Sequence, residues 1–389
     1  MRSGASPTNG TGHGEEPGND DTNARVGALL QDLAITQTSE HRRWAYSRAA
    51  DAILSLDEPL EALVQADGSL KKIAHVGPSS SRVVFEVLRE GRSPTVDALI
   101  ATSGRLAEVE RSRSLRQHFL SRARVRVLLA YDSTRGPHVE DYRGDFQMHS
   151  VWSDGGETLD AMIQVALARR YTHSAITDHS GGLSIARGMS MSDVARQHHE
   201  IDALNLEYAD RFRLLKGIEA NIDVEGGLDL APADLPLFDI VVAAPHSKLR
   251  VTDDQTARLV SVTSTPGVHI LGHPRGRKYG TRAGIVADWD AVFEEAARRN
   301  VAIEIDGDPA RQDIDFTLAR RALEAGCLFA LDSDAHRTSE FRYAEIALAH
   351  AKLAGVPVER IVNCWELDRL LEWARDRKAP RGRPVRRKK

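Results

Sequence analysis

The sequence predicts an α/β protein in which a closed (β/α) barrel follows a small all-α block. Two patterns support this prediction. From Arg143 onward, short apolar stretches alternate with helical stretches rich in Ala, Arg, Leu and Glu, and strands separated by helices form parallel βα units. Six or seven such units follow one another, with polar residues at nearly every strand's C-terminal end, which is typical of a barrel.

Length and composition agree with one large barrel and a smaller module. The chain has 389 residues, of which 41% are hydrophobic and 28% charged, as in ordinary globular proteins. The formal net charge of −4 means that any attraction to nucleic acid must come from local patches. Cys327 and Cys364 are the two cysteines and lie far apart, which argues against a disulfide framework and a thiolate zinc site. We therefore expect a cytoplasmic protein.

The all-α block is predicted over residues 25–104. Apolar residues recur there at helical spacing within 29–33, 44–54 and 83–88. A short helix is also expected around 60–64. The block is long enough to form a domain with its own small core.

Three segments flank the predicted domains. Residues 1–24 contain no aromatic or large aliphatic side chain except Met1, so we expect them to be disordered. Residues 105–142 are Arg-rich and are interpreted as a linker, in which 125–130 could form a short strand. Residues 378–389 carry seven positive charges and two prolines and should form a solvated tail.

The barrel is predicted over residues 143–377. A helix around 159–168 precedes the first apolar strand. The expected strands are 175–177, 214–219, 239–244, 269–272, 301–305 and 328–331. No apolar run approaches the ~20 residues that span a bilayer, and the N-terminus lacks the apolar region of a signal peptide.

Ionisable side chains follow these strands and are candidate metal ligands. An apolar run, then His, Asp or Glu, then Gly, Ser or Pro recurs six times. The candidate residues are Gln147, His149, Asp154, His179, Glu219, His246, His273, Asp334 and His336. Burying that many ionisable groups together without cations would be costly.

The ligand types indicate the chemistry. Imidazoles with several carboxylates suit Zn, Mn or Fe, and there are more ligands than one ion needs. Two or three ions that share a bridging carboxylate can activate water, hold phosphate oxygens and stabilise a leaving oxygen. The set therefore predicts phosphoester hydrolysis.

These motifs also carry a family resemblance. The stretches DFQMHSVWSDG, ITDHSGGL, GIEANI, APHSKLR, ILGHPRGR, EIDGDPARQD and DSDAH resemble the PHP (polymerase and histidinol phosphatase) superfamily, above all the PHP domain of bacterial family X DNA polymerases. The resemblance implies a distorted (β/α)7 barrel with up to three ions, with manganese favoured and zinc or iron as alternatives. The implied ligand sets are position 147, His149, Glu219 and Asp334 for the first ion, Glu219, His246 and His273 for the second, and Asp154, His179 and His336 for the third.

The chain departs from the family at one ligand, because Gln147 stands where the family has His. An amide oxygen is a weaker donor than imidazole, so the first site would bind its ion loosely or stand empty. Two readings stay open. Two ions suffice for catalysis, or the enzyme is slow or silenced.

Basic residues near the motifs are candidates for phosphate contacts. Lys248, Arg275, Arg277 and Arg311 match basic positions of the family, and Arg binds phosphate bidentately. The alternative is that they are solvated surface side chains. With Glu219 as bridge, and His179 and Asp334 as ligands, Arg275, Arg277 and Lys248 complete the expected catalytic set.

The N-terminal block and the tail resemble nucleic-acid-binding elements. Residues 70–88 resemble a helix-hairpin-helix, although one hairpin glycine and the following Lys are missing and Pro78 lacks an N–H donor. Residues 380–384, PRGRP, resemble an AT-hook. The polymerase palm is absent, since fewer than forty residues separate residue 105 from the barrel.

These features lead to one expected function and two alternatives. We expect a DNA repair enzyme that processes 3′ ends, as a 3′–5′ exonuclease, a 3′-phosphatase or an abasic-site nuclease. DNA would be held by the barrel rim, the helical domain and the tail, in association with the nucleoid. The alternatives are a histidinol-phosphate-type small-molecule phosphatase and a catalytically weakened DNA-binding protein.

Overall fold

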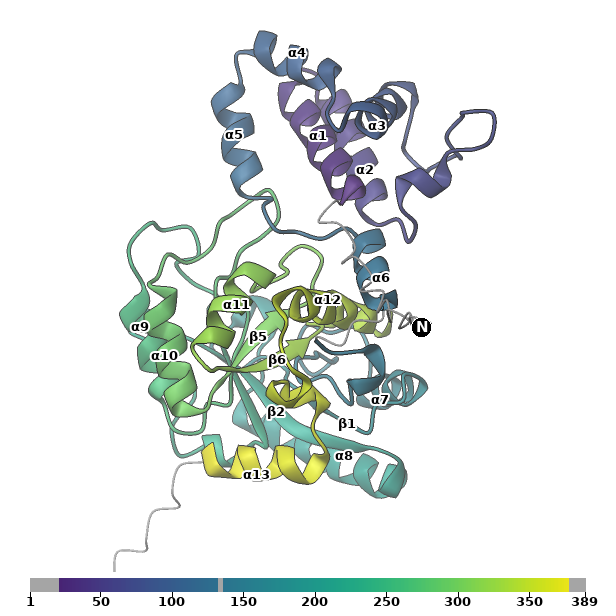
Figure 1. Ribbon diagram of the computed structural model, residues 1–389. Helices are drawn as coiled ribbons and strands as arrows, with labels where there is room; N and C mark the ends of the chain where they lie inside the picture. Colours follow the sequence, from purple (N-terminus) through teal and green to yellow (C-terminus); the bar gives the residue numbers. More distant parts are fainter. Residues whose placement is uncertain (1–20, 132–135, 378–389) are drawn as a thin grey trace, which may run out of the picture.

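The computed structural model describes residues 21–131 and 136–377, which form a helical module and a barrel (Figure 1). Residues 1–20 and the basic tail at 378–389 lie outside the described residues. The expectation of disorder up to residue 24 is wrong for its last residues. Helix α1 (Thr22–Thr36) begins there because the Asp21 side chain accepts a hydrogen bond from the amide of Ala24 and caps the helix.

The helical module extends further than predicted. It contains α1, α2 (Glu40–Leu54), the 3-10 turn η1 (Leu60–Leu63), α3 (Pro78–Glu90), α4 (Pro94–Ser103) and α5 (Leu106–Ser114). Helices α3 and α4 both begin with proline, which lacks the N–H that the first helical turn leaves unpaired. Val109 of α5 is fully buried in the same core as Val26, Leu30 and Val84, so the module continues past residue 104 into the expected linker.

The expected helix-hairpin-helix does not have its two helices within 70–88. That stretch contains α3 alone, preceded by irregular chain from 71 to 77. The expected strand at 125–130 is also wrong, because these residues belong to helix α6 (Arg122–Ala130). Ser121 caps α6, and Val125 and Leu128 pack against Ile346 of helix α12 (Ala344–Ala354).

The barrel is built from parallel strands in sequence order. The strands are β1 (His173–Ile176), β2 (Arg213–Asn221), β3 (Ile240–Ala244), β4 (Ile270–Leu271), β5 (Ala302–Asp306) and β6 (Leu328–Asp332). The helices around them are α7 (Leu159–Ala168), α8 (Met191–Tyr208), α9 (Thr256–Ser264), α10 (Trp289–Arg299), α11 (Phe316–Glu324) and α12 (Figure 1). Strand residues are almost entirely buried, as expected for a sheet covered by crossover helices.

A further extended segment, residues 143–149, closes the sheet between its first and last strands. On one side, the amides of Ala175 and Thr177 donate to the carbonyls of Asp145 and Met148, both at 2.9 Å. On the other, the amide of His149 donates to the carbonyl of Ala335 at 2.8 Å, just beyond β6. This closing segment connects the two edges of the six-stranded sheet by hydrogen bonds, so the predicted α/β barrel is confirmed.

The N-terminal ends of the strands are covered by a helix. Ile240, Ala302 and Leu328 open their strands and belong to one buried cluster with Trp365 and Trp373. Trp373 lies on helix α13 (Leu367–Arg377), which runs below the barrel in Figure 1. We call this covered end the floor. The functional end must then be the opposite one, where the strands terminate.

The helical module joins the barrel at that opposite end. Gln312, in the loop after β5, makes two hydrogen bonds with the backbone of Leu120. The Leu120 amide donates to Gln312 Oε1 at 2.8 Å, and Gln312 Nε2 donates to the Leu120 carbonyl at 3.0 Å. Figure 1 shows the module on the side away from α13. Within the described residues, no helix is long and apolar enough to cross a membrane.

Candidate metal centre

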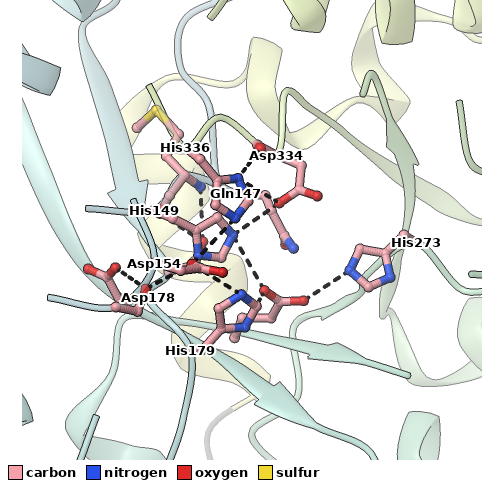
Figure 2. A network of polar contacts seen from close by, with 12 residues as sticks. Gln147, His149, Asp154, Asp178, His179, His273, Asp334 and His336 are labelled. Atoms are coloured by element: carbon pink, nitrogen blue, oxygen red, sulfur yellow. Dashed lines mark hydrogen bonds and ion pairs between the residues drawn. The ribbon is translucent and has the colours of Figure 1, made fainter. Parts of the chain in front are cut away.

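The predicted ligands converge at the C-terminal ends of the strands. His149 ends the closing segment, His179 and His273 follow β1 and β4, and Glu219 lies in β2. Figure 2 shows His149, His179, Asp334 and His336 directed toward one another. We call this the cup. Residues scattered over nearly two hundred positions meet there because parallel strands all end at the same rim.

Glu219 lies at the centre of the cup and is almost completely buried. Its Oε1 is 3.0 Å from His273 Nε2 and 3.3 Å from His246 Nε2. Its Oε2 is 3.0 Å from His179 Nδ1 and 3.4 Å from His149 Nε2. Burial by itself would raise the pKa of this carboxyl, but the surrounding imidazoles outweigh burial and hold the pKa well below its usual range. Glu219 therefore stays ionised and can bridge two cations.

A second carboxylate, that of Asp154, lies near two imidazoles of the cup. Its Oδ1 is 3.4 Å from His336 Nε2 and 3.6 Å from His179 Nε2. The ring of His149 stacks between these two imidazoles, with ring centroids 4.5 Å from His179 and 4.3 Å from His336. Burial lowers the pKa of His179 to about 4, so this imidazole is neutral and has a lone pair available at neutral pH.

These residues fit divalent cations. With metal–ligand bonds of about 2.1 Å, neighbouring ligand atoms lie roughly 3.0–3.4 Å apart, close to the separations in the cup. His179 Nδ1 and Glu219 Oε2 are 3.0 Å apart, yet neither makes a hydrogen bond although both are buried. Two atoms that approach without bonding each other are suitably placed to share a third atom. The donor set of imidazole and carboxylate suits Zn, Mn or Fe.

Neighbouring polar groups orient the ligands. His246 Nδ1 is 3.2 Å from Asn221 Oδ1, and His336 Nδ1 is 2.8 Å from the Asp334 carbonyl oxygen. Both oxygens can only accept, so the Nδ1 atoms carry protons, and the Nε2 atoms are the ones that face the cup. The sequence did not single out Asn221, although it follows Glu219 by two residues on the same strand.

Asp178 is another residue whose role the sequence did not reveal. Its carboxylate accepts hydrogen bonds from the Ser150 amide at 2.8 Å, the Ser150 hydroxyl at 2.6 Å and Gln197 Nε2 at 2.6 Å. A further bond of 2.5 Å comes from the hydroxyl of Ser153. Asp178 therefore fixes the turn that carries His149 and Asp154. Its position beside His179 was the available signal.

Gln147 lies in the closing segment on the same side as His149, because side chains two residues apart in an extended chain share a face. It is fully buried, and neither its amide oxygen nor its amide nitrogen has a hydrogen-bond partner in the described structure. A buried amide without partners is costly in free energy of folding.

A group of buried carboxyls that the sequence did not predict lies within the barrel. Its members are Asp145, Glu304, Asp306 and Asp332. Burial raises the pKa of Asp332 to about 6 and raises that of Glu304 well above its usual range. The candidate ligands were recognised as ionisable residues that follow apolar runs. Glu304 and Asp332 instead lie within strands β5 and β6.

Two arginines that were expected to bind phosphate, Arg275 and Arg277, contact other groups of the protein. Arg277 is buried, and its guanidinium donates to the carbonyl oxygens of Arg311 at 2.9 Å and Gln312 at 2.6 Å, and to the Asp315 carboxylate at 3.1 Å. It also stacks 4.1 Å above the ring of Phe119. Arg275 pairs with Asp315 at 3.2 Å. The structure therefore gives both arginines structural partners outside the cup.

The remaining basic candidates lie closer to the ligands. Arg311 Nη2 is 3.3 Å from Asp334 Oδ2, at the edge of the cup. Lys248 is exposed two residues after His246, with a left-handed backbone at φ 55°. Asp334 and His273 also have positive φ, at 52° and 22°. Strained backbone at non-glycine residues gathers here, as it does at functional sites.

Comparisons with known proteins agree with this site. The chain is 34% identical over 237 residues to the DNA polymerase/3'-5' exonuclease PolX of Bacillus subtilis, a match that covers 61% of the chain but 41% of that relative. It is 30% identical over 234 residues to the probable phosphatase YcdX of Shigella flexneri, covering 57% of the chain and 90% of that relative. A probable phosphatase of Thermoanaerobacter sp. is 29% identical over 187 residues, which are 45% of the chain and 74% of that relative.

A solved structure of histidinol phosphate phosphatase from Lactococcus lactis, complexed with Zn, L-histidinol and phosphate, aligns with 55% of the chain and 94% of its own. That alignment has 18% identity and a TM-score of 0.43. No family model matches the chain. The chain spans less than half of the Bacillus relative, whereas it covers nearly all of the Shigella phosphatase at 30% identity. This protein therefore belongs to the PHP family of metal-dependent phosphoesterases.

Proposed function

We propose that the protein removes phosphate or nucleotides from the 3′ ends of DNA during repair. The observation that carries the proposal is the convergence of four imidazoles on the buried carboxylate of Glu219, beside a rim to which a helical module is attached. The possible reactions are those of a 3′–5′ exonuclease, a 3′-phosphatase or an abasic-site nuclease. Manganese is the favoured ion, with zinc or iron as alternatives.

The residues of the cup suit phosphoester hydrolysis. Divalent ions supply Lewis acidity toward a phosphoryl group and activate water. Glu219 and Asp154 would hold the charge of such ions, and the Nδ1 contacts of His246 and His336 turn the Nε2 atoms of both rings toward the cup. Arg311 offers guanidinium N–H groups at the edge of the cup, where they can bind phosphate oxygens.

The helical module supports a DNA substrate. It joins the barrel at the rim, so a strand that leaves the cup passes close to it. Lys71, Lys72 and Arg82 are exposed around the start of α3, whose first turn leaves backbone N–H groups available for a phosphate. The basic tail, with Arg381 and Arg383, would add further contacts to the backbone or minor groove. Nucleoid association would follow from this binding.

A small-molecule phosphatase is the second candidate. The Shigella relative, a probable phosphatase, is matched over 90% of its length by 57% of this chain. A third candidate is a DNA-binding protein whose catalysis is weakened by Gln147. It differs from the first in predicting DNA binding without hydrolysis.

The deciding experiment compares substrates and variants. The natural protein, with Mn²⁺, is incubated with DNA labelled at its 3′ end or bearing a 3′-phosphate, and in parallel with histidinol phosphate. We expect processing of DNA 3′ ends, a loss of at least a hundredfold in His179→Ala, and no loss in Glu207→Gln, which alters an exposed carboxylate on α8. Hydrolysis of histidinol phosphate alone would select the second candidate. Tight DNA binding without cleavage would select the third.

A further inference from the structure

The carboxylate of Asp334 contacts both Arg311 and the candidate metal ligand His149. Asp334 Oδ1 is 3.0 Å from His149 Nε2, whereas Oδ2 is 3.3 Å from Arg311 Nη2. The Nε of Arg311 lies 3.7 Å from Asp306 Oδ2 and 3.8 Å from Asp308 Oδ2. A permanent positive charge therefore stands among three carboxylates, beside the position expected for the first ion.

The loop around Arg311 is held in place. The Asp308 side chain accepts from the amide of Ala310 at 2.7 Å, and the amide of Arg311 donates to the Asp308 carbonyl at 2.8 Å. Arg277 donates to the carbonyls of Arg311 and Gln312 from outside the cup. Because the backbone is tied on both sides, the guanidinium is presented to Asp334 without a large loss of loop entropy.

The remaining first-site residue contributes little. Gln147 brings a neutral amide, and its oxygen can hold an ion only weakly compared with imidazole or carboxylate. Among the described residues, ligand atoms within 4.8 Å of one another form two groups. One contains His149, Asp154, His179 and His336, and the other His179, Glu219 and His246. Neither group includes Asp334.

We propose that the protein holds two divalent ions, and that the Arg311 guanidinium supplies at Asp334 the positive charge that a further ion would supply. This inference rests on the proposed function of the cup as a metal-dependent phosphoesterase site. The carboxylates that face the cup or Arg311 are Asp154, Glu219, Asp306, Asp308 and Asp334. A third ion beside Asp334 would face the Arg311 guanidinium, a like charge, at close range.

Metal content tests the proposal without reference to activity. Chelator-stripped protein is equilibrated with a fixed concentration of free Mn²⁺, and bound manganese per folded chain is measured by elemental analysis. We expect two ions in the natural protein and two in Gln147→His, because Arg311 still occupies the position. The double variant Gln147→His with Arg311→Met should bind three. In the control, Gln147→His is combined with Arg320→Met, which alters an exposed guanidinium bonded to the Leu353 carbonyl. This control should stay at two.

Three ions in the natural protein or in Gln147→His would overturn the proposal, as would two ions in a folded double variant. If the double variant does not fold, as judged by circular dichroism, the first two proteins still decide the question. Failure of the proposed function has a different signature, because a protein that binds two ions but hydrolyses no phosphoester would contradict the function and leave the ion count intact.

Discussion

Arg277 and Arg311 are 34 positions apart, and the guanidinium of Arg277 donates a hydrogen bond to the backbone carbonyl of Arg311. Arg277 is only 4% exposed, and its charge is matched by Asp315 at 3.1 Å. Phe119, from the chain that leads out of the helical module, covers its face. At the residue scale, this side chain therefore acts by holding the loop that presents Arg311.

Replacing Arg277 tests that role. Arg277→Met removes a buried cation and leaves Asp315 and several carbonyl groups short of donors, so the free energy of unfolding should fall by about 3–5 kcal/mol. Arg275→Met, which changes a partly exposed partner of the same Asp315, should cost about 1 kcal/mol or less. Urea unfolding of the metal-free proteins measures both. If Arg277→Met kept normal stability but raised KM, Arg277 would be a phosphate clamp after all.

Single residues also show why part of the site was predictable. Glu219, His246 and His273 each stand after an apolar run, and that pattern is visible in the sequence. The partners of Arg277 are backbone carbonyls, which any residue supplies, so no sequence pattern could distinguish it from a phosphate-binding arginine. Asp178 acts through hydrogen bonds to Ser150 and Asn221 through a contact with His246, and both depend on distances that only the folded chain defines.

At the scale of elements, helix α12 and the loop after β5 are joined by a buried imidazole. The amide of Phe316 donates to His350 Nδ1 at 3.1 Å, so His350 Nε2 carries the proton and donates to Gln312 Oε1 at 2.8 Å. Burial, reinforced by the charge of Arg277, lowers the pKa of His350 to about 3. The imidazole is thus neutral in the folded protein over the whole range in which a histidine usually titrates.

This histidine should make stability depend on pH. The unfolded chain binds a proton at His350 below about pH 6.5, whereas the folded protein binds it only below about pH 3. Acid therefore favours unfolding. The contribution is absent at pH 7.5 and should reach about 2 kcal/mol of lost stability at pH 5. Urea unfolding of metal-free protein at the two pH values should show a smaller loss in His350→Gln than in the natural protein.

The exposed His199 provides the control for this comparison. His199→Gln should follow the natural protein at both pH values. An equal loss in the natural protein and His350→Gln would mean that other groups account for the acid sensitivity.

Elements also show where sequence patterns mislead. The apolar run at 125–130 is too short for its periodicity to distinguish strand from helix, and packing of Val125 and Leu128 on α12 makes it the helix α6. The closing segment is difficult to recognise from the sequence for a different reason. Its Asp145, Gln147 and His149 face the interior of a functional barrel, so it lacks the apolar alternation that identifies an ordinary strand.

At the scale of the molecule, the net charge is −4, so the proposed binding of DNA would require local positive patches. Lys71 and Lys72 are exposed shortly before α3 and Arg82 is exposed within its first turns, and we call these three residues the patch. Barrel and module meet at the rim through Gln312, Leu120 and Arg277. The barrel was predictable from alternating strands and helices, whereas the extent of the module was not, because α5 is polar and is joined to the core chiefly by Val109.

The patch predicts a change in salt dependence. Replacing Lys71, Lys72 and Arg82 together by Ser should weaken DNA binding and lower the slope of log K against log salt by about 2–3, since each lost phosphate contact removes roughly 0.7–0.9. Fluorescence anisotropy at several salt concentrations measures the slope. Hydrolysis of a small phosphoester should be unchanged, because the patch is remote from Glu219.

The matched control alters charge at the floor instead. Arg369 and Arg375 are exposed on α13, and replacing both by Ser removes positive charge from the end away from the cup. This variant should keep the natural slope. A slope that fell equally in both variants would place the DNA elsewhere on the molecule.

The helix that seals the floor has a kinetic consequence. Trp365 and Trp373 fill the narrow end of the barrel together with the first residues of the strands. If the proposed 3′-phosphatase reaction takes place at Glu219, inorganic phosphate is released at the rim end of the barrel, where the next substrate also binds. Turnover should accordingly show competitive inhibition by its own phosphate product.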